Sequence, residues 1–310
     1  AELRLDRPDV LLAAGHRYNR LAVRAARSTG AEAGRRVPVF VTLHNPVQPV
    51  FRHKPALRRY LRYWSMRRYC QQAAGIIAVS RGVAEDVSAV VGLASRDIAV
   101  IRNPLLSAEV LAQAREACSH PWLRDKAGQP VLLSVGRLSA QKAYPVLLRA
   151  FSLLVRRRPA RLVVLGEGPE RASLEALAGR LGIAPQVSFP GFVANPLSCM
   201  REASAFVLSS AWEGLGNVLI EALAVDCPVV ATDCPGGVRE VLDDGRCGRL
   251  VPANDPLALA DAVDEVLDAP RTAARCDGLL AEYRIDRVAG HYLAHFEREL
   301  GGRSNRRRPL

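Results

Sequence analysis

Short apolar runs alternate with longer amphipathic stretches along most of the chain. The runs are rich in valine and isoleucine and have the length of buried strands, and the stretches between them have helical character. This alternation predicts the α/β class, with parallel sheets covered by helices. The expected strands are residues 9–15, 38–45, 75–80, 98–101, 131–136, 161–165, 187–189, 205–208, 228–232 and 248–251, and the expected helices include 17–27, 55–72, 82–91 and 144–157.

The alternation runs twice, which predicts two domains with a core each. A chain of 310 residues that is 49% hydrophobic is long enough for both cores. We expect the first domain to cover residues 1–104 and the second 105–285, with the boundary in an irregular stretch at 103–129. Residues 286–300 predict a last helix, and the basic tail 301–310 is expected to be disordered.

Two carboxylates flank a Gly-x-Gly turn in the second half. Glu213 precedes Gly214-Leu215-Gly216, and Glu221 lies one to two turns into the helix expected next. Such a turn exposes backbone N–H groups and the helix start adds partial positive charge, which together seat a phosphate. Carboxylates on both sides suit a nucleotide sugar. The alternative is a solvated Glu213 and a Glu221 that only complements the helix dipole.

Two cations follow the strand expected at residues 131–136. Arg137 comes directly after Gly136, and Lys142 follows before the next helix. Cations at such a junction reach ligands bound at the carboxyl ends of parallel strands. They could instead be surface charges of a basic chain, but lysine is rare here, occurring only at Lys54, Lys126 and Lys142.

As an ordered set, these motifs resemble the retaining GT-B glycosyltransferases of the "glycosyl transferases group 1" family, of the family 4 type. The resemblance rests on residues 135–138 with Lys142, 165–169, 191–192, 213–221, 228–233 and 236–237. It implies two Rossmann-like domains whose parallel sheets face a cleft, and a last helix that returns to the first domain. It also implies a truncated first domain, short by about 60 to 80 residues at roughly 30 per βαβ unit. The family usually has glycine where this chain has Ala143.

The resemblance implies a role for each motif. Arg137, Lys142 and the backbone of residues 216–219 would stabilise negative charge on the leaving diphosphate. Glu213 would contact sugar hydroxyls, Glu221 the ribose, and His44 the donor sugar from the first domain. The implied donor-binding set is Gly136, Gly166, Gly168, Phe192, Gly214, Leu215, Gly216, Asn217, Val218, Leu219 and Glu221.

Some of these positions have plainer alternatives. Phe192 could equally be a core residue. A lone histidine at a strand end, such as His44, is a structural residue in the alternative interpretation. His16 could line the acceptor side, but a structural role is favoured for it. No metal or other cofactor is expected, because the chain has no Asp-x-Asp triplet.

The resulting hypothesis is retaining transfer of a hexose or N-acetylhexosamine from a nucleotide-diphosphate sugar, with UDP favoured, to a glycan or lipid-linked acceptor. One alternative is a nucleotide-sugar-binding module with little turnover, because the first domain would be incomplete. Another is a GT-B epimerase or phosphorylase. A phosphorylase of the glycogen type needs a pyridoxal-phosphate lysine, and the scarcity of lysine, with Lys142 already assigned, argues against it.

The net charge of +12 suits acidic ligands. Residues 52–69 form a basic stretch with interleaved aromatics, in which Leu57, Leu61 and Trp64 share a helix face with Tyr60 near it. They predict either a core stripe or peripheral contact with an anionic membrane. Nucleic-acid binding is the weaker expectation, because no recognised motif accompanies the charge.

Seven cysteines without CxxC or metal-ligand spacing are expected to be reduced thiols packed as small apolar residues. No apolar run reaches the length of about 18 residues that spans a bilayer. The chain begins at Ala1 without a signal-peptide pattern. These features predict a cytoplasmic protein with peripheral contact at the inner membrane face.

Overall fold

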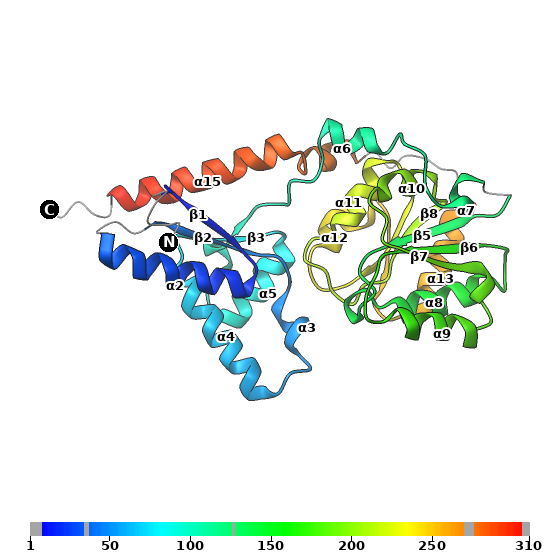
Figure 1. Ribbon diagram of the computed structural model, residues 1–310, viewed down its shortest axis with the longest axis horizontal. Coiled ribbons are helices and arrows are strands. Elements are labelled where there is room, and N and C mark those ends of the chain that lie inside the picture. The colour runs from blue at the N-terminus through cyan, green and yellow to red at the C-terminus, as the bar shows by residue number, and fades with distance from the viewer. Residues whose placement is uncertain (1–7, 34–36, 126–127, 270–275, 306–310) are drawn as a thin grey trace. The chain divides into compact units, whose positions relative to one another are not determined.

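The computed structural model describes residues 8–33, 37–125, 128–269 and 276–305. They form two compact units (Figure 1). Unit 1 is Ala1–Pro104 with Asp286–Leu310, and unit 2 is Leu105–Ile285.

Unit 2 is built on a sheet of six parallel strands in the order β10-β9-β8-β5-β6-β7. Chain order therefore reverses between β5 and β8, which lie side by side with Leu132 opposite Ala205. Parallel sheets of this doubly wound type bind ligands outside the carboxyl ends of the strands at that reversal. The strands are β5 (Val131–Val135), β6 (Arg161–Leu165), β7 (Val187–Gly191), β8 (Ala205–Leu208), β9 (Val229–Asp233) and β10 (Arg249–Pro252).

Helices cover both faces of this sheet (Figure 1). On one face α8 packs against α9 and α13, while α10, α11 and α12 lie together on the other. The helices of unit 2 are α6 (Ala108–Gln113), α7 (Pro121–Arg124), α8 (Tyr144–Leu154), α9 (Arg171–Arg180), α10 (Pro196–Glu202), α11 (Asn217–Ala224), α12 (Val238–Val241), α13 (Pro256–Asp268) and α14 (Asp277–Ala281).

The apolar pattern explains this layering. Residues 131–134 of β5 are all buried, because a parallel sheet with helices on both sides shields both faces of a strand. Helix α8 has a proline in its first turn, where a missing N–H is tolerated, and it buries Leu147 and Phe151 against the sheet. Each such side chain contributes about 1.5–3 kcal/mol on burial.

Unit 1 has four parallel strands in chain order, β1 (Leu11–Ala14), β2 (Val39–Leu43), β3 (Gly75–Ala78) and β4 (Ala99–Val100). Its core includes Phe40, Ile77 and Val288, so the last helix packs on this sheet. The rings of Phe40 and Phe296 lie 4.5 Å apart. The helices are α2 (His16–Ala33), α3 (Val47–Phe51), α4 (Ala56–Cys70), α5 (Arg81–Val91) and α15 (Ile285–Asn305).

The structure corrects two expectations about irregular segments. The stretch 103–129 contains the short helices α6 and α7, each begun by a side-chain cap from Ser107 or His120. Helix α15 continues to Asn305, so disorder from residue 301 is wrong as far as that residue. A glycine costs a helix only about 1 kcal/mol, and the preceding turns propagate the hydrogen-bond ladder. Residues 306–310 lie outside the described residues.

The expectation of seven reduced thiols is also wrong. Disulfides join Cys118 to Cys199 and Cys247 to Cys276. The paired residues are 81 and 29 positions apart in the chain, and the fold brings their Cα atoms to 4.8 and 6.0 Å. Only the fold creates this proximity, so no spacing rule reveals it. The remaining cysteines, Cys70, Cys227 and Cys234, are buried as free thiols, as expected for small apolar residues.

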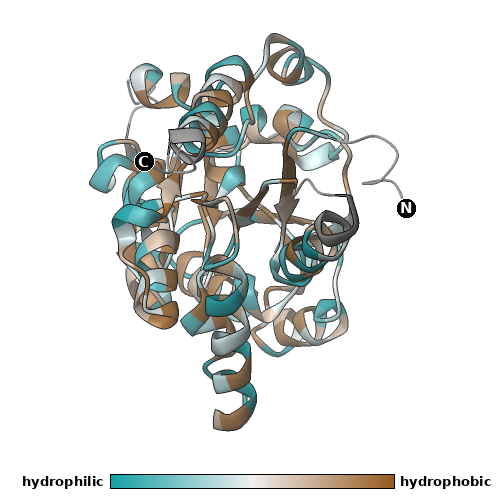
Figure 2. Ribbon diagram, turned by 90° about the vertical axis from the view of Figure 1, so that its left-hand side faces the viewer, coloured by the Kyte–Doolittle hydropathy of each residue, from teal (hydrophilic) through white to brown (hydrophobic). Residues whose placement is uncertain are grey.

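The expectation of a core stripe on α4 fails as well. Leu57, Tyr60, Leu61 and Trp64 are 51–69% exposed, and the helix buries Met66, Tyr69 and Cys70 instead. Figure 2 shows hydrophobic and hydrophilic residues alternating along α4 at the lowest part of the ribbon. Across the residues described, no helix combines the length and the apolar character that crossing a bilayer requires.

Candidate functional site

The strand reversal in unit 2 brings two loops together. Residues 136–143 follow β5, and residues 209–216 follow β8. The loops are tied by backbone and side-chain bonds: Ala211 N–H donates to the Gln141 carbonyl at 2.8 Å, and the Ser209 hydroxyl donates to the Lys142 carbonyl at 2.8 Å. Residues some 70 positions apart therefore form one site at the carboxyl ends of β5 and β8.

An ion pair lies at the centre of this site. Lys142 Nζ is 2.6 Å from Glu213 Oε1, and the side chains are only 15% and 8% exposed. The Ser210 hydroxyl donates to the same carboxylate oxygen at 2.7 Å, and Gln141 Nε2 lies 3.5 Å from Oε2. The alternative of a solvated Glu213 is therefore wrong. A partly shielded carboxylate with several donors is pre-oriented to accept hydrogen bonds from a ligand.

Glycines let the backbone come close around this pair. A Cβ at Gly136 would lie 2.7 Å from Lys142 Cε, and one at Gly166 would lie 2.1 Å from the Gly136 carbonyl oxygen. A Cβ at Gly168 would meet the Leu138 carbonyl at 2.2 Å, and one at Gly236 would meet the Glu213 carbonyl at 1.6 Å. Larger residues at these positions would push the loops apart.

The Gly-x-Gly turn leads directly into a helix. Gly214, Leu215 and Gly216 are buried, and Gly216 has φ 90° at the start of α11. The first turn of α11 is Asn217, Val218, Leu219 and Ile220, of which Leu219 and Ile220 are buried. Glu221 follows and is half-buried. Burial raises the pKa of its carboxyl above the ordinary value, and the Lys142 charge offsets only part of this rise. Both expected carboxylates therefore lie near Lys142.

The other expected residues lie around or away from this pair. Arg137 is exposed beside Gly136. Phe192 is 78% exposed after β7, so the alternative of a core residue is wrong. His44 belongs to unit 1, where its Nε2 lies 2.8 Å from the Thr42 hydroxyl and burial lowers its pKa.

Sequence reasoning missed Gln141 and Ser210, which both contact Glu213. Their positions in the sequence could have indicated them, because Gln141 directly precedes Lys142 and Ser210 lies three residues before Glu213. The structure also explains why the family usually has glycine where this chain has Ala143. This residue adopts the left-handed conformation, with φ 46° and ψ 40°, at the start of α8.

The arrangement suits an anion that also carries hydroxyl groups. Lys142 and the start of α11 supply positive charge, and the two carboxylates accept hydrogen bonds. Within the described ranges no three His, Cys, Asp or Glu side chains group as metal ligands.

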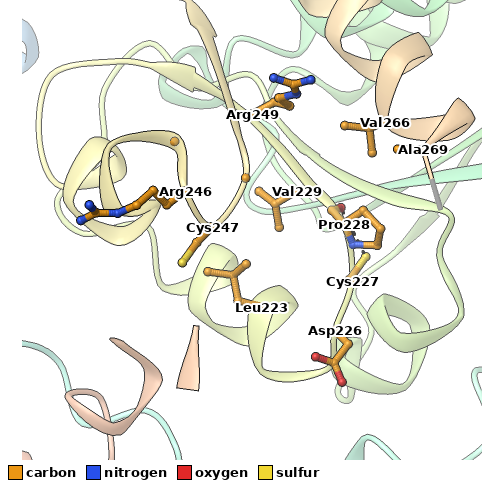
Figure 3. A pocket seen from close by; sticks show the side chains of 12 residues that line it. Leu223, Asp226, Cys227, Pro228, Val229, Arg246, Cys247, Arg249, Val266 and Ala269 are labelled. Carbon is orange, nitrogen blue, oxygen red and sulfur yellow. Dashed lines mark hydrogen bonds between the residues drawn. The ribbon is translucent and has the colours of Figure 1, made fainter. Parts of the chain in front are cut away.

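A separate hollow of about 250 Å³ lies at the other ends of the strands in unit 2 (Figure 3). Pro228, Val229 and Arg249 line it at the starts of β9 and β10, beside Cys227 and Cys247. It is therefore distinct from the site at Lys142.

Comparison with known protein families identifies the family of this chain. The family model described as "Glycosyl transferases group 1" matches residues 120–278, about half of the chain. The chain belongs to this family. A second family model, "Glycosyltransferase Family 4", matches residues 1–105.

Several curated glycosyltransferases are similar to the chain. The alpha-D-kanosaminyltransferase of Streptomyces kanamyceticus is 30% identical over 249 residues, which are 77% of this chain and 64% of the relative. The Campylobacter jejuni N-acetylgalactosamine-N,N'-diacetylbacillosaminyl-diphospho-undecaprenol 4-alpha-N-acetylgalactosaminyltransferase is 32% identical over 193 residues, 62% of this chain and 50% of the relative. The chain thus spans one half to just under two thirds of these relatives.

Solved structures show the same GT-B fold. The Anabaena protein HepE, crystallised with UDP, matches with a TM-score of 0.74 at 20% identity, covering 93% of this chain and 78% of HepE. Sucrose-phosphate synthase of Thermosynechococcus elongatus matches with a TM-score of 0.76 at 20% identity, covering 97% and 75%. The expected α/β fold with two parallel sheets is confirmed.

Proposed function

We propose that this chain transfers a hexose or N-acetylhexosamine from a nucleotide-diphosphate sugar, with UDP as the favoured nucleotide, to a glycan or lipid-linked acceptor. The transfer retains the configuration at the anomeric carbon and needs no metal. Membership of the glycosyl transferases group 1 family supports the reaction class. The relatives named above act on sugars or sugar-linked lipids, as their names state.

The observation that carries the proposal is the shielded Lys142–Glu213 pair at the strand reversal. Breaking the bond to a diphosphate builds negative charge on the leaving oxygen, and fixed cations and N–H groups aimed there lower the barrier. Lys142, Arg137 and the start of α11 have this role in the proposal. Glu213 holds the sugar hydroxyls, Glu221 holds the ribose, and the glycines 136, 166 and 168 admit the donor close to the backbone.

Two further residues enter the proposal, His44 of unit 1 and Phe192 of unit 2. His44 lies at the end of β2 and is assigned to the donor sugar. Phe192, exposed after β7, borders the nucleoside.

Titration calorimetry with UDP in EDTA tests donor binding without metal. We expect UDP to bind, and Lys142→Met to weaken binding at least tenfold. The exposed Arg180→Gln, at the end of α9, is the control and should bind as the unchanged chain does. Loss of binding on adding the chelator would contradict metal independence.

Transfer itself needs a separate measurement. Incubation with UDP-glucose or UDP-N-acetylglucosamine and a phosphate-linked or free glycan should give a product whose anomeric proton, by NMR, keeps the donor's α configuration. An inverted product would overturn the retaining mechanism. UDP binding without any transfer would favour the binding-module alternative.

We also propose peripheral contact between residues 52–69 and an anionic membrane. The exposed Leu57, Tyr60, Leu61 and Trp64 on the basic α4 support it, because an interfacial helix needs apolar side chains flanked by cations.

A further inference from the structure

Two hollows lie between α2 and α4 in unit 1. Their volumes are about 380 and 780 Å³. They share Arg20 and Ser65, so they adjoin, and together they are called the α2–α4 groove below. Each hollow falls within the range of about 300–1,000 Å³ typical of small-molecule sites.

The lining of the α2–α4 groove is strongly basic. On α2, Arg20, Arg24 and Arg27 follow one another at spacings of four and three residues, so they share one helix face. On α4, Arg58 and Arg62 are four residues apart and share a face, while Arg68 lines the larger hollow. Lys54 completes the set of seven cations, and no carboxylate among the described side chains lines either hollow.

Within the described part of the chain, these cations lack the acidic partners that several arginines of unit 2 have. In unit 2, ion pairs with carboxylates involve Arg157, Arg158, Arg171, Arg201, Arg239, Arg246 and Arg249. Among the residues that the structure describes, no lining cation of the groove forms an ion pair. Arg27 donates to Gln72 at 2.7 Å, and Arg62 lies 4.8 Å from the centre of the Phe51 ring, which are both neutral. Converging cations without counter-charges repel one another, so the groove is complementary to an anion.

His16 lines the smaller hollow, where β1 leads into α2. Its Nδ1 is 3.2 Å from the Tyr69 hydroxyl, and its Nε2 is buried without a hydrogen-bond partner among the described residues. Burial, Arg62 and Arg20 lower the pKa of His16 to about 4. When Nδ1 accepts from Tyr69, the neutral ring keeps its proton on the buried Nε2, so His16 adds no positive charge to the groove.

We propose that the α2–α4 groove binds a phosphate-bearing acceptor, and that Arg20, Arg58 and Arg62 hold the phosphate beside His16. Guanidinium groups bind phosphate oxygens in a bidentate way, which suits this set of arginines. Arg24, Arg27 and Arg68 line the adjoining larger hollow and hold a second anionic group of the acceptor, such as the second phosphate of a diphosphate. The identification of the bound anion as an acceptor rests on the proposed glycosyl transfer. The anion site itself does not depend on that proposal.

The test uses the full chain saturated with UDP, so that the site at Lys142 is occupied, and inorganic pyrophosphate as the probe. Calorimetry should show one further pyrophosphate site. The double variant Arg20→Gln/Arg62→Gln should weaken it at least tenfold. The matched control is Arg17→Gln/Arg67→Gln, which removes the same two charges from the same two helices at positions that line neither hollow. Equal pyrophosphate affinity in both double variants, or no pyrophosphate site, would overturn the proposal.

Two competitors distinguish the source of the phosphate. A soluble hexose 1-phosphate that displaces pyrophosphate supports a soluble acceptor. Displacement by phosphatidylglycerol vesicles as well supports an acceptor carried by lipid. If vesicles bind through Arg20 and Arg62 while neither soluble phosphate does, the groove is a membrane contact and the proposal is wrong.

The same experiment separates this inference from the proposed function. If UDP binds and the groove variants leave pyrophosphate binding unchanged, only the acceptor inference fails. If the pyrophosphate site is lost in Arg20→Gln/Arg62→Gln but the chain never binds UDP, the donor assignment fails and the anion site stands.

Discussion

Ala143 carries a backbone conformation that L-residues rarely adopt. Its φ of 46° and ψ of 40° place it in the left-handed region, at the junction between Lys142 and α8. That conformation costs a residue with a Cβ about 1–2 kcal/mol, whereas glycine adopts it freely. The strain sits one residue from the ion pair, so the loop tolerates it only because surrounding contacts hold it.

We therefore predict that Ala143→Gly stabilises unit 2. The relief of strain is partly offset by the greater freedom of glycine in the unfolded chain, about 0.4–1 kcal/mol, which leaves a net gain of roughly 0.5 kcal/mol. Urea unfolding measures it. Ala176→Gly, at an exposed position inside α9, is the control and should lose about 1 kcal/mol. A loss of stability in both variants would show that Ala143 is not strained.

We expect the two carboxylates near Lys142 to have different functions, Glu221 in UDP binding and Glu213 in turnover. Glu221→Gln should weaken UDP binding by roughly 1.5–3 kcal/mol, the worth of a charge-assisted hydrogen bond. Glu213→Gln should leave UDP affinity nearly unchanged and mainly lower turnover, because that carboxylate is assigned to the sugar. Calorimetry with UDP and initial-rate kinetics measure the two effects, with Glu175→Gln on the exposed side of α9 as the control. Equal losses of UDP affinity at both positions would contradict the assignment.

His16 makes the stability of unit 1 depend on pH. Its folded-state pKa of about 4 lies below the ordinary value of 6.5, because burial, Arg62 and Arg20 disfavour the imidazolium. The unfolded chain therefore binds the proton more readily, so His16's contribution is complete above pH 6.5 and is lost as the pH falls towards 4. Urea midpoints measured between pH 7 and 4 should fall less steeply in His16→Gln, with His53→Gln at an exposed position as the control. An unchanged slope in His16→Gln would contradict the shift.

At the scale of elements, α4 presents apolar side chains to solvent instead of to a core. Leu61 and Trp64 are 53% and 51% exposed. The double variant Leu61→Ser/Trp64→Ser should change the free energy of unfolding by less than about 1 kcal/mol, because surface substitutions rarely do more. It should reduce binding to phosphatidylglycerol vesicles in a sedimentation assay. Leu257→Ser, exposed on α13 in unit 2, is the control for lost apolar surface. Unchanged vesicle binding by the double variant would refute membrane contact through α4.

Elements were the scale at which sequence patterns performed best. A strand lies within or overlaps every stretch where one was expected. The inner strands β2, β5 and β8 are buried along almost their whole length, which requires uninterrupted apolar runs. Patterns did worse where periodicity is weak. The short helices α6 and α7 depend on caps from Ser107 and His120. The apolar stripe of α4 is exposed, because burial of a helix face depends on what packs against it and not on its own sequence.

At the scale of the whole molecule, both disulfides lie within unit 2. Reduction should therefore destabilise unit 2 by about 2–4 kcal/mol per bond and leave unit 1 unchanged, if the two units unfold separately. Thermal unfolding with and without reductant measures this. Mass spectrometry after alkylation of the unreduced, urea-unfolded chain should find three modified cysteines, Cys70, Cys227 and Cys234. Seven modified cysteines in that sample would contradict the disulfides, and Cys70→Ser should leave the reductant effect on unit 2 unchanged.

The order of apolar runs, glycines and charged residues determined the fold class, the family and the segment around Glu213, because these depend on neighbours in the chain and on periodicities that burial imposes. Only the tertiary structure decided which distant groups meet. The Lys142–Glu213 pair spans 71 positions, and Cys118 reaches Cys199 across 81. The α2–α4 groove likewise arises because two helices, each basic and ordinary alone, pack with their arginines on facing sides. Proximity in space between residues far apart in sequence is set by strand order and helix packing, and no local pattern encodes it.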